Sequence, residues 1–65
     1  MTKLYCTWKD KTFYINHYVK NNETQEIGFI ISIIKNNISK KILVKYNDRK
    51  ILYIDEMLNN LDLIE

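Results

Sequence analysis

Hydrophobic and polar residues alternate in two short runs near the start of the chain. In residues 3–8, one face carries Leu4, Cys6 and Trp8. In residues 13–19, one face carries Phe13, Ile15, His17 and Val19. Strict alternation predicts half-buried strands, and the polar residues 9–11 between the runs have the length of a hairpin turn. We therefore expect an N-terminal β-hairpin with His17 on its buried face.

The apolar run at residues 27–34 fits two structures. The spacing of Ile27, Ile30, Ile31 and Ile34 matches one face of a helix, and an α+β alternative makes residues 23–36 helical. However, the run contains five isoleucines and a glycine, and both residue types disfavour helix interiors. A continuous apolar run of this length is typical of a buried strand. We favour the strand.

The last third of the chain predicts a hairpin followed by a helical turn. Residues 41–46 alternate, the polar residues 47–50 suit a tight turn, and residues 51–54 return as a strand. Asp55 is a suitable N-cap, and the residues near helical spacing after it are Met57, Leu58, Leu61 and Ile64. We expect one mostly β domain spanning residues 1–65. It should be a small barrel or open antiparallel sheet of about five strands with a short C-terminal helical turn.

This order of segments resembles a known fold family. Gly28 opens a long strand, residues 41–54 read as strand, Asn/Asp turn and strand, and Met57-Leu58 sit in the helical turn. Over residues 26–63 the pattern resembles the small SH3-like barrels of the Tudor and KOW type. The resemblance implies the fold and no ligand. The turn lacks the glycine common in those families, and the aromatic cage of methyl-lysine-reading Tudor domains cannot be placed.

Composition argues against catalysis, metals and cofactors. With 65 residues and one cysteine, the chain can form no internal disulfide. Cys6 and His17, the only histidine, have no further pair to complete a zinc site. His17 also has no adjacent partner for acid–base work, and a single glycine cannot form a phosphate loop. We expect no enzymatic activity, no cofactor and no metal.

The chain also lacks an apolar run long enough to span a membrane and a signal-peptide core. Its lone cysteine fits a reducing compartment. We therefore expect a cytoplasmic protein.

Charge is distributed unevenly. Residues 1–54 carry ten basic and four acidic residues, a net of +6, whereas residues 55–65 carry four acids and no base, a net of −4. The basic part can attract phosphates. Alternatively, the lysines provide solubility and the acids complement the helix dipole. The acids of the C-terminal segment are Asp55, Glu56, Asp62 and Glu65.

Three tyrosines are predicted to point outward together from the N-terminal strands: Tyr5, Tyr14 and Tyr18. Lys9 and Lys11 lie along the same hairpin. Aromatic rings interleaved with lysines suit single-stranded nucleic acid, and tyrosine is also enriched at protein interfaces. Cross-strand tyrosine pairs can instead simply stabilise the hairpin.

These observations favour a non-catalytic protein–protein interaction module. One version is a phage or mobile-element inhibitor of a host protein, whose acidic C-terminal segment imitates phosphates. The alternative is a nucleic-acid-binding module that uses the Lys/Tyr face of the hairpin. A homodimer is compatible with either, because residues 30–34 are apolar on both faces of a strand.

Overall fold

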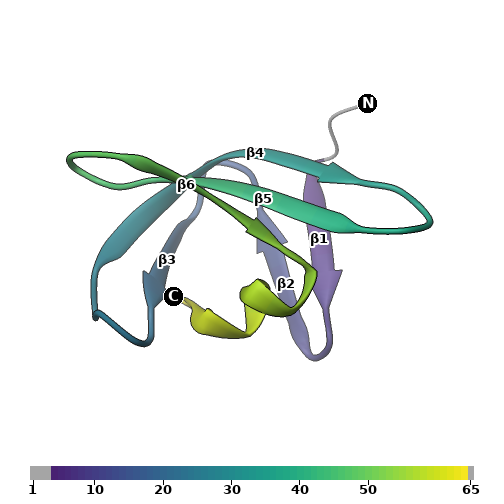
Figure 1. The fold of residues 1–65 in the computed structure, drawn as a ribbon, viewed down its shortest axis with the longest axis horizontal. Coiled ribbons are helices and arrows are strands. Elements are labelled where there is room, and N and C mark those ends of the chain that lie inside the picture. Colours follow the sequence, from purple (N-terminus) through teal and green to yellow (C-terminus); the bar gives the residue numbers. More distant parts are fainter. Residues whose placement is uncertain (1–3, 65) are drawn as a thin grey trace.

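The computed structural model describes residues 4–64, so Lys3, where the first strand was predicted to begin, and Glu65 lie outside it. The described chain is mostly β (Figure 1). Its elements are β1 (Tyr5–Trp8), β2 (Lys11–Tyr14), β3 (Tyr18–Asn21), β4 (Ile27–Lys35), β5 (Lys40–Lys45), β6 (Lys50–Ile54), the 3₁₀ helix η1 (Asp55–Asn60) and β7 (Leu61–Leu63).

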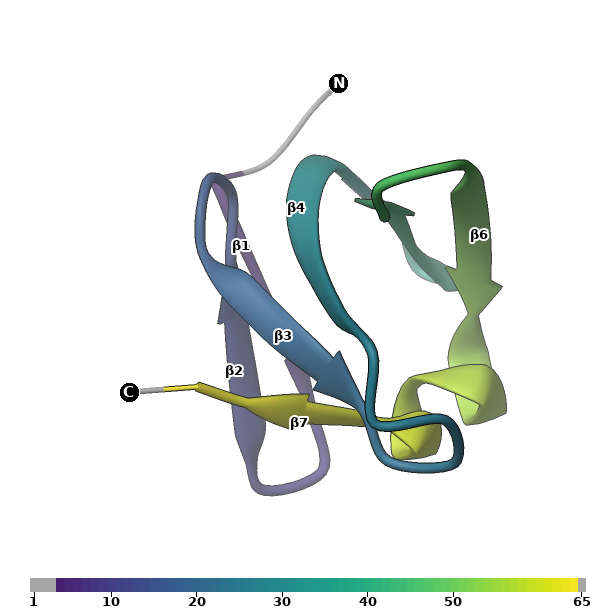
Figure 2. The same ribbon diagram turned by 90° about the vertical axis from the view of Figure 1, so that its left-hand side faces the viewer.

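The strands form two antiparallel sheets. One contains five strands in the order β6-β5-β4-β3-β7, and the other is the hairpin β1-β2. The hairpin lies on the opposite side of the molecule from β6 (Figure 2). Within the described residues the larger sheet is open, with β6 and β7 as its edges. The predictions of a mostly β fold and an N-terminal hairpin are confirmed, and the helical alternative for residues 23–36 is wrong because β4 occupies most of that segment.

A β-bulge changes which residues of β4 face the core. The register between β4 and β5 passes from Ile30↔Val44 to Ser32↔Leu43, so Ile31 is an extra residue. An extra residue reverses which side chains face the core. Ile30 and Ile33, three apart in sequence, are therefore both fully buried.

The predicted strand at residues 13–19 is broken in the middle. Asn16 has φ 72°, a left-handed conformation that asparagine tolerates, and the chain turns there. Asn16 N–H donates to Ile30 O (2.9 Å), and Ile30 N–H donates to His17 O (3.0 Å). Because the turn ends the alternation that began at Phe13, the prediction that His17 lies on the buried face is wrong, and its side chain is exposed.

The C-terminal segment is helical for one short stretch only. Asp55 has φ 49° and does not cap η1; instead its Oδ1 accepts a hydrogen bond from Lys40 N (2.8 Å). The predicted helical turn is confirmed, but its continuation to Ile64 is wrong. Leu61–Leu63 form β7, which pairs with β3 through Val19↔Leu63 and Asn21↔Leu61.

The core lies between the curved sheet, η1 and the hairpin. Its fully buried side chains are Cys6, Phe13, Val19, Ile30, Ile33, Ile42, Val44, Leu58 and Leu61. Two nearly buried tyrosine hydroxyls, of Tyr46 and Tyr53, bond to each other, and Asn21 Nδ2 donates to Tyr53 Oη (3.2 Å). Burial and the bond to Tyr53 raise the pKa of Tyr46. The network satisfies polar groups that would otherwise be costly to bury.

Candidate binding surfaces

The three predicted tyrosines are exposed. The side chains of Tyr5, Tyr14 and Tyr18 are 49%, 47% and 56% exposed. Tyr5 and Tyr14 are cross-strand partners in the hairpin, with ring centroids 6.2 Å apart. The imidazole of His17 lies 5.3 Å from the Tyr14 ring. The outward orientation predicted for the tyrosines is confirmed.

Two of these tyrosines border a hollow, here called the apolar pocket. Its volume is about 310 Å³, and its lining comes from β2, β3, β4, β7 and the segments beside them: Thr12, Tyr14, His17, Tyr18, Val19, Ile30, Leu63 and Ile64. Val19 and Ile30 are fully buried, whereas Leu63 and Ile64 are 45% and 39% exposed. The pocket therefore combines a core floor with a half-exposed apolar rim.

The turn at Asn16 positions this pocket. It separates β2 from β3, so that Tyr14 projects from the hairpin and Tyr18 from the larger sheet. β7 then brings Leu63 beside Val19 by pairing with β3. Among the described residues, no acidic or lysine side chain lines the pocket, so the arrangement suits burial of an apolar group.

The hairpin lysines do not interleave with the tyrosines as predicted. Lys11 lies on the face of buried Phe13, and its Nζ donates to Leu61 O (3.0 Å) and Asp62 Oδ1 (3.1 Å). Lys9 lies in the turn, with Nζ 5.7 Å from the Trp8 ring centroid. Lys9 and Lys11 therefore do not form the predicted Lys/Tyr platform; Lys35 of β4 instead lies over Tyr5, with its Nζ 4.2 Å from the ring centroid.

The three predicted acids that the structure describes, Asp55, Glu56 and Asp62, do not form one cluster. Asp55 accepts the Lys40 N–H, and Asp62 accepts hydrogen bonds from Lys11 and Asn22. The bond from Lys11 lowers the pKa of Asp62. Glu56 is exposed, and Glu65 lies outside the described residues. Asp55 and Asp62 thus form hydrogen bonds within the chain.

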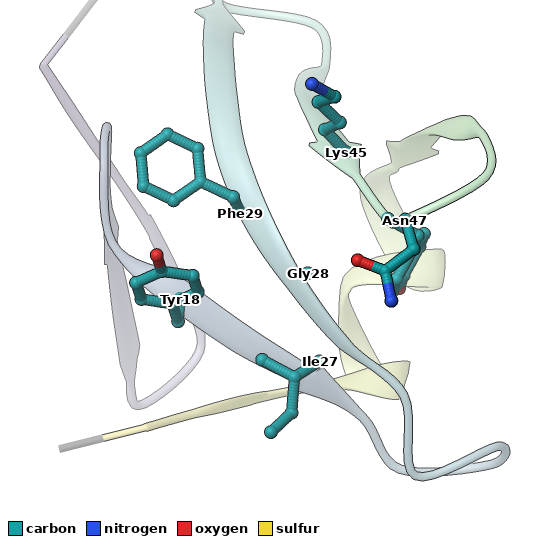
Figure 3. Close-up of a pocket in the computed structure, with 7 residues that line it drawn as sticks. Tyr18, Ile27, Gly28, Phe29, Lys45 and Asn47 are labelled. Atoms are coloured by element: carbon teal, nitrogen blue, oxygen red, sulfur yellow. The ribbon is translucent and has the colours of Figure 1, made fainter.

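A second hollow lies on the outer face of the larger sheet (Figure 3). Its volume is about 350 Å³, and it is lined by Tyr18, Ile27, Gly28, Phe29, Lys45, Tyr46 and Asn47. Sequence reasoning identified only Tyr18 among the residues of this site. The alternation of residues 41–46 placed Lys45 away from the core, but only strand pairing sets it beside Phe29.

An ion pair joins two loops next to this hollow. The guanidinium of Arg49 donates to both carboxylate oxygens of Glu26 (2.6 and 2.9 Å) and to Asp48 (2.9 Å). It also lies 4.8 Å from the Tyr46 ring centroid. Hydrogen bonding from Arg49 lowers the pKa of Glu26 to about 2. The pair ties the β3–β4 loop to the β5–β6 turn.

The lowered pKa of Glu26 makes the stability of the fold depend on pH between about 4.5 and about 2. Because the folded pKa of Glu26 is depressed from 4.5, its contribution is present above about pH 4.5 and is lost as pH falls toward about 2. Thermal melts between about pH 2 and 6 should show this decline, and Glu26→Gln should reduce its slope. Glu23→Gln, with the same charge change, should keep the wild-type slope. Equal slopes in the two variants would contradict the role of the pair.

Between residues 4 and 64, no group of three or more His, Cys, Asp and Glu side chains is placed to hold a metal ion. The thiol of Cys6 is buried in the core, and desolvation raises its pKa. No helix in the described part of the chain is long and apolar enough to cross a membrane. Comparisons with protein-family models, with curated proteins and with solved structures found no match.

Proposed function

We propose that this chain is a non-catalytic protein-binding module whose apolar pocket receives an apolar side chain of its partner. One observation carries the proposal: a buried floor of Val19 and Ile30 opens between half-exposed rims from two different sheets. The volume is at the small end of the roughly 300–1,000 Å³ found for ligand pockets. It suits one anchoring side chain better than a large cofactor.

The rim residues favour a protein partner. Tyrosine is enriched at interface centres because its ring covers a large area at low conformational cost. Tyr14 and Tyr18 both line the pocket, and Leu63 and Ile64 extend the apolar rim. An apolar side chain of the partner that enters between them would be removed from water, because the surrounding side chains would enclose it as in an interface hot spot.

The order of elements supports a relationship to the SH3-like barrels as part of this proposal. β4 begins beside Gly28, the β5–β6 turn contains Asn47 and Asp48, and η1 links β6 to the edge strand β7. A cytoplasmic location is also proposed, supported by the free, buried thiol of Cys6. Inhibition of a host protein is one form this binding would take. Phosphate mimicry is not part of the proposal, because Asp55 and Asp62 are engaged within the chain.

Selection of peptides from a displayed library tests the proposal without a known partner. We expect selected peptides to share a large apolar residue. Their affinity should fall about tenfold or more for Ile64→Asp, because a carboxylate at the rim disfavours an apolar anchor. The matched control is Ile38→Asp in the β4–β5 loop, where the native side chain is 92% exposed and does not line the pocket. It should change affinity by no more than about twofold.

Thermal melts establish that both variants fold before affinities are compared. Failure to enrich any peptide, or equal loss of affinity in the two variants, would contradict the proposal. Sedimentation of the wild-type protein tests whether a second copy of the chain occupies the pocket. A dimer that Ile64→Asp dissociates would mean that a second copy fills the pocket.

A further inference from the structure

A row of outward-facing side chains crosses four strands of the larger sheet. Strand register places Tyr18 opposite Phe29, Phe29 opposite Lys45, and Lys45 opposite Lys50. We call these four residues the aromatic–lysine row. Adjacent strands are about 4.8 Å apart, so Phe29 and Lys50 are separated by about 10 Å. Two aromatic rings and two ammonium groups therefore lie in one row across the sheet.

The two rings of the row pack against each other on the outer face. They meet edge to face with centroids 5.1 Å apart, and Phe29 is half-buried beside the more exposed Tyr18. In Figure 3 both rings lie on one side of β4, and Lys45 lies on the other. Gly28 also lines the hollow between them. A planar group can enter the hollow and contact a ring.

Lysines gather on this face, with Asp62 of β7 opposite Lys20 at its edge. The outward positions of β3, β4, β5 and β6, those that alternate with buried residues, include no acid and carry Lys20, Lys41, Lys45 and Lys50. Within residues 4–64, no carboxylate forms an ion pair with Lys45 or Lys50. Glu26 and Asp48, in the loops next to this hollow, both form ion pairs with Arg49, and the three side chains together carry one net negative charge. The row is therefore complementary to an anion.

We infer that the aromatic–lysine row binds single-stranded nucleic acid. Bases stack on Tyr18 and Phe29 while phosphates lie against Lys45 and Lys50, the combination that single-strand-binding surfaces use. A duplex hides its base faces within the stack, so the rings favour a single strand. The site differs from the hairpin face that the sequence suggested, because Lys11 is held by Asp62.

This inference goes beyond the proposed protein-binding function and can fail separately from it. Tyr18 lines both hollows, but Phe29 and Lys45 line only the outer one. Changes at Lys45 and Lys50 therefore test nucleic-acid binding without altering the lining of the apolar pocket, whereas Phe29 packs against Tyr18 and so contacts its rim.

Fluorescence anisotropy with labelled oligo-dT and oligo-rU of about ten nucleotides is the test, at about 50 mM salt and above. The double variant Lys45→Gln/Lys50→Gln should bind about tenfold more weakly. The slope of the logarithm of affinity against the logarithm of salt concentration should be shallower by about 1.4, because each lost phosphate contact accounts for about 0.7. The matched control Lys9→Gln/Lys35→Gln removes the same charge away from the row and should change affinity by about twofold or less.

Phe29→Leu separates stacking from charge. It keeps an apolar side chain and all lysines, and it should weaken binding about fivefold or more because a stacked base is lost. Thermal melts confirm that each variant is folded. Any of four results would overturn the inference: no wild-type binding at about 50 mM salt, equal losses in the two lysine pairs, unchanged affinity in Phe29→Leu, or equal affinity for duplex and single strand.

Discussion

Replacing Leu58 with alanine is expected to lower the free energy of unfolding by about 3 kcal/mol, within the range for fully buried leucines. Leu58 is the buried residue of η1, and it fills the core where the chain passes from β6 to β7. A domain of this size has only about 3–10 kcal/mol of stability. The melting temperature should therefore fall by about 12–24 °C, measured by thermal or urea unfolding with Trp8 fluorescence as the signal.

The neighbouring residue supplies the control for Leu58→Ala. Met57 lies in the same 3₁₀ helix and is 43% exposed, so Met57→Ala should cost less than about 1 kcal/mol. Because both variants remove apolar atoms from the same turn, their difference isolates burial from helix propensity. Equal losses in the two variants would contradict the packing of η1 against the sheet.

Gly28→Ala is expected to cost about 3 kcal/mol, at the upper end of the range for overpacked cores. A Cβ at Gly28 would lie 2.9 Å from Tyr46 Cε1 and still closer to Val44 Cγ1. Both neighbours are buried, and Tyr46 is held by its hydroxyl bond to Tyr53. Neither can move away cheaply. Urea unfolding measures the loss, with Ser32→Ala on the same strand as the control.

A double-mutant cycle tests the cause of that loss. Val44→Ala removes the Cγ1 that a new Cβ would meet, so Gly28→Ala should cost less in the Val44→Ala background than in the wild type. The contact with Tyr46 remains, so part of the cost should persist. Strict additivity of the two changes, or a loss below about 1 kcal/mol for Gly28→Ala alone, would contradict the steric explanation.

Local patterns were sufficient to predict much of the sheet. The hairpin at the N-terminus and the pair formed by residues 40–54 follow from alternation and from turns rich in polar residues. These elements depend mainly on neighbours in sequence. The β-branched residues of β4 also favoured the strand correctly over the helix.

Features that depend on distant contacts were missed. The turn at Asn16 is held by hydrogen bonds to Ile30, and the bulge at Ile31 exists only relative to β5. β7 has three residues and is stabilised by pairing with β3, and its Leu61 was assigned to a helix. Single-sequence periodicity does not contain these pairings.

The candidate binding surfaces were likewise predicted only in part from the sequence. Exposure of Tyr14 and Tyr18 followed from alternation, but their pocket also needs Leu63 and Ile64 from the other end of the chain. Lys11 was expected beside the tyrosines, yet it reaches Asp62, 51 positions away in sequence. The orientation of a side chain was predicted correctly where it depends on its own strand. It was missed where it depends on pairing with another strand.

The most direct test of the central claim is a two-dimensional NMR titration of the isotope-labelled protein with a selected apolar peptide. The account predicts that the largest shift changes fall on residues lining the apolar pocket, including Thr12, Val19 and Leu63. Residues of the outer sheet face, such as Leu43 and Leu52, should change little. Changes centred on that outer face, with the pocket residues unaffected, would contradict the account.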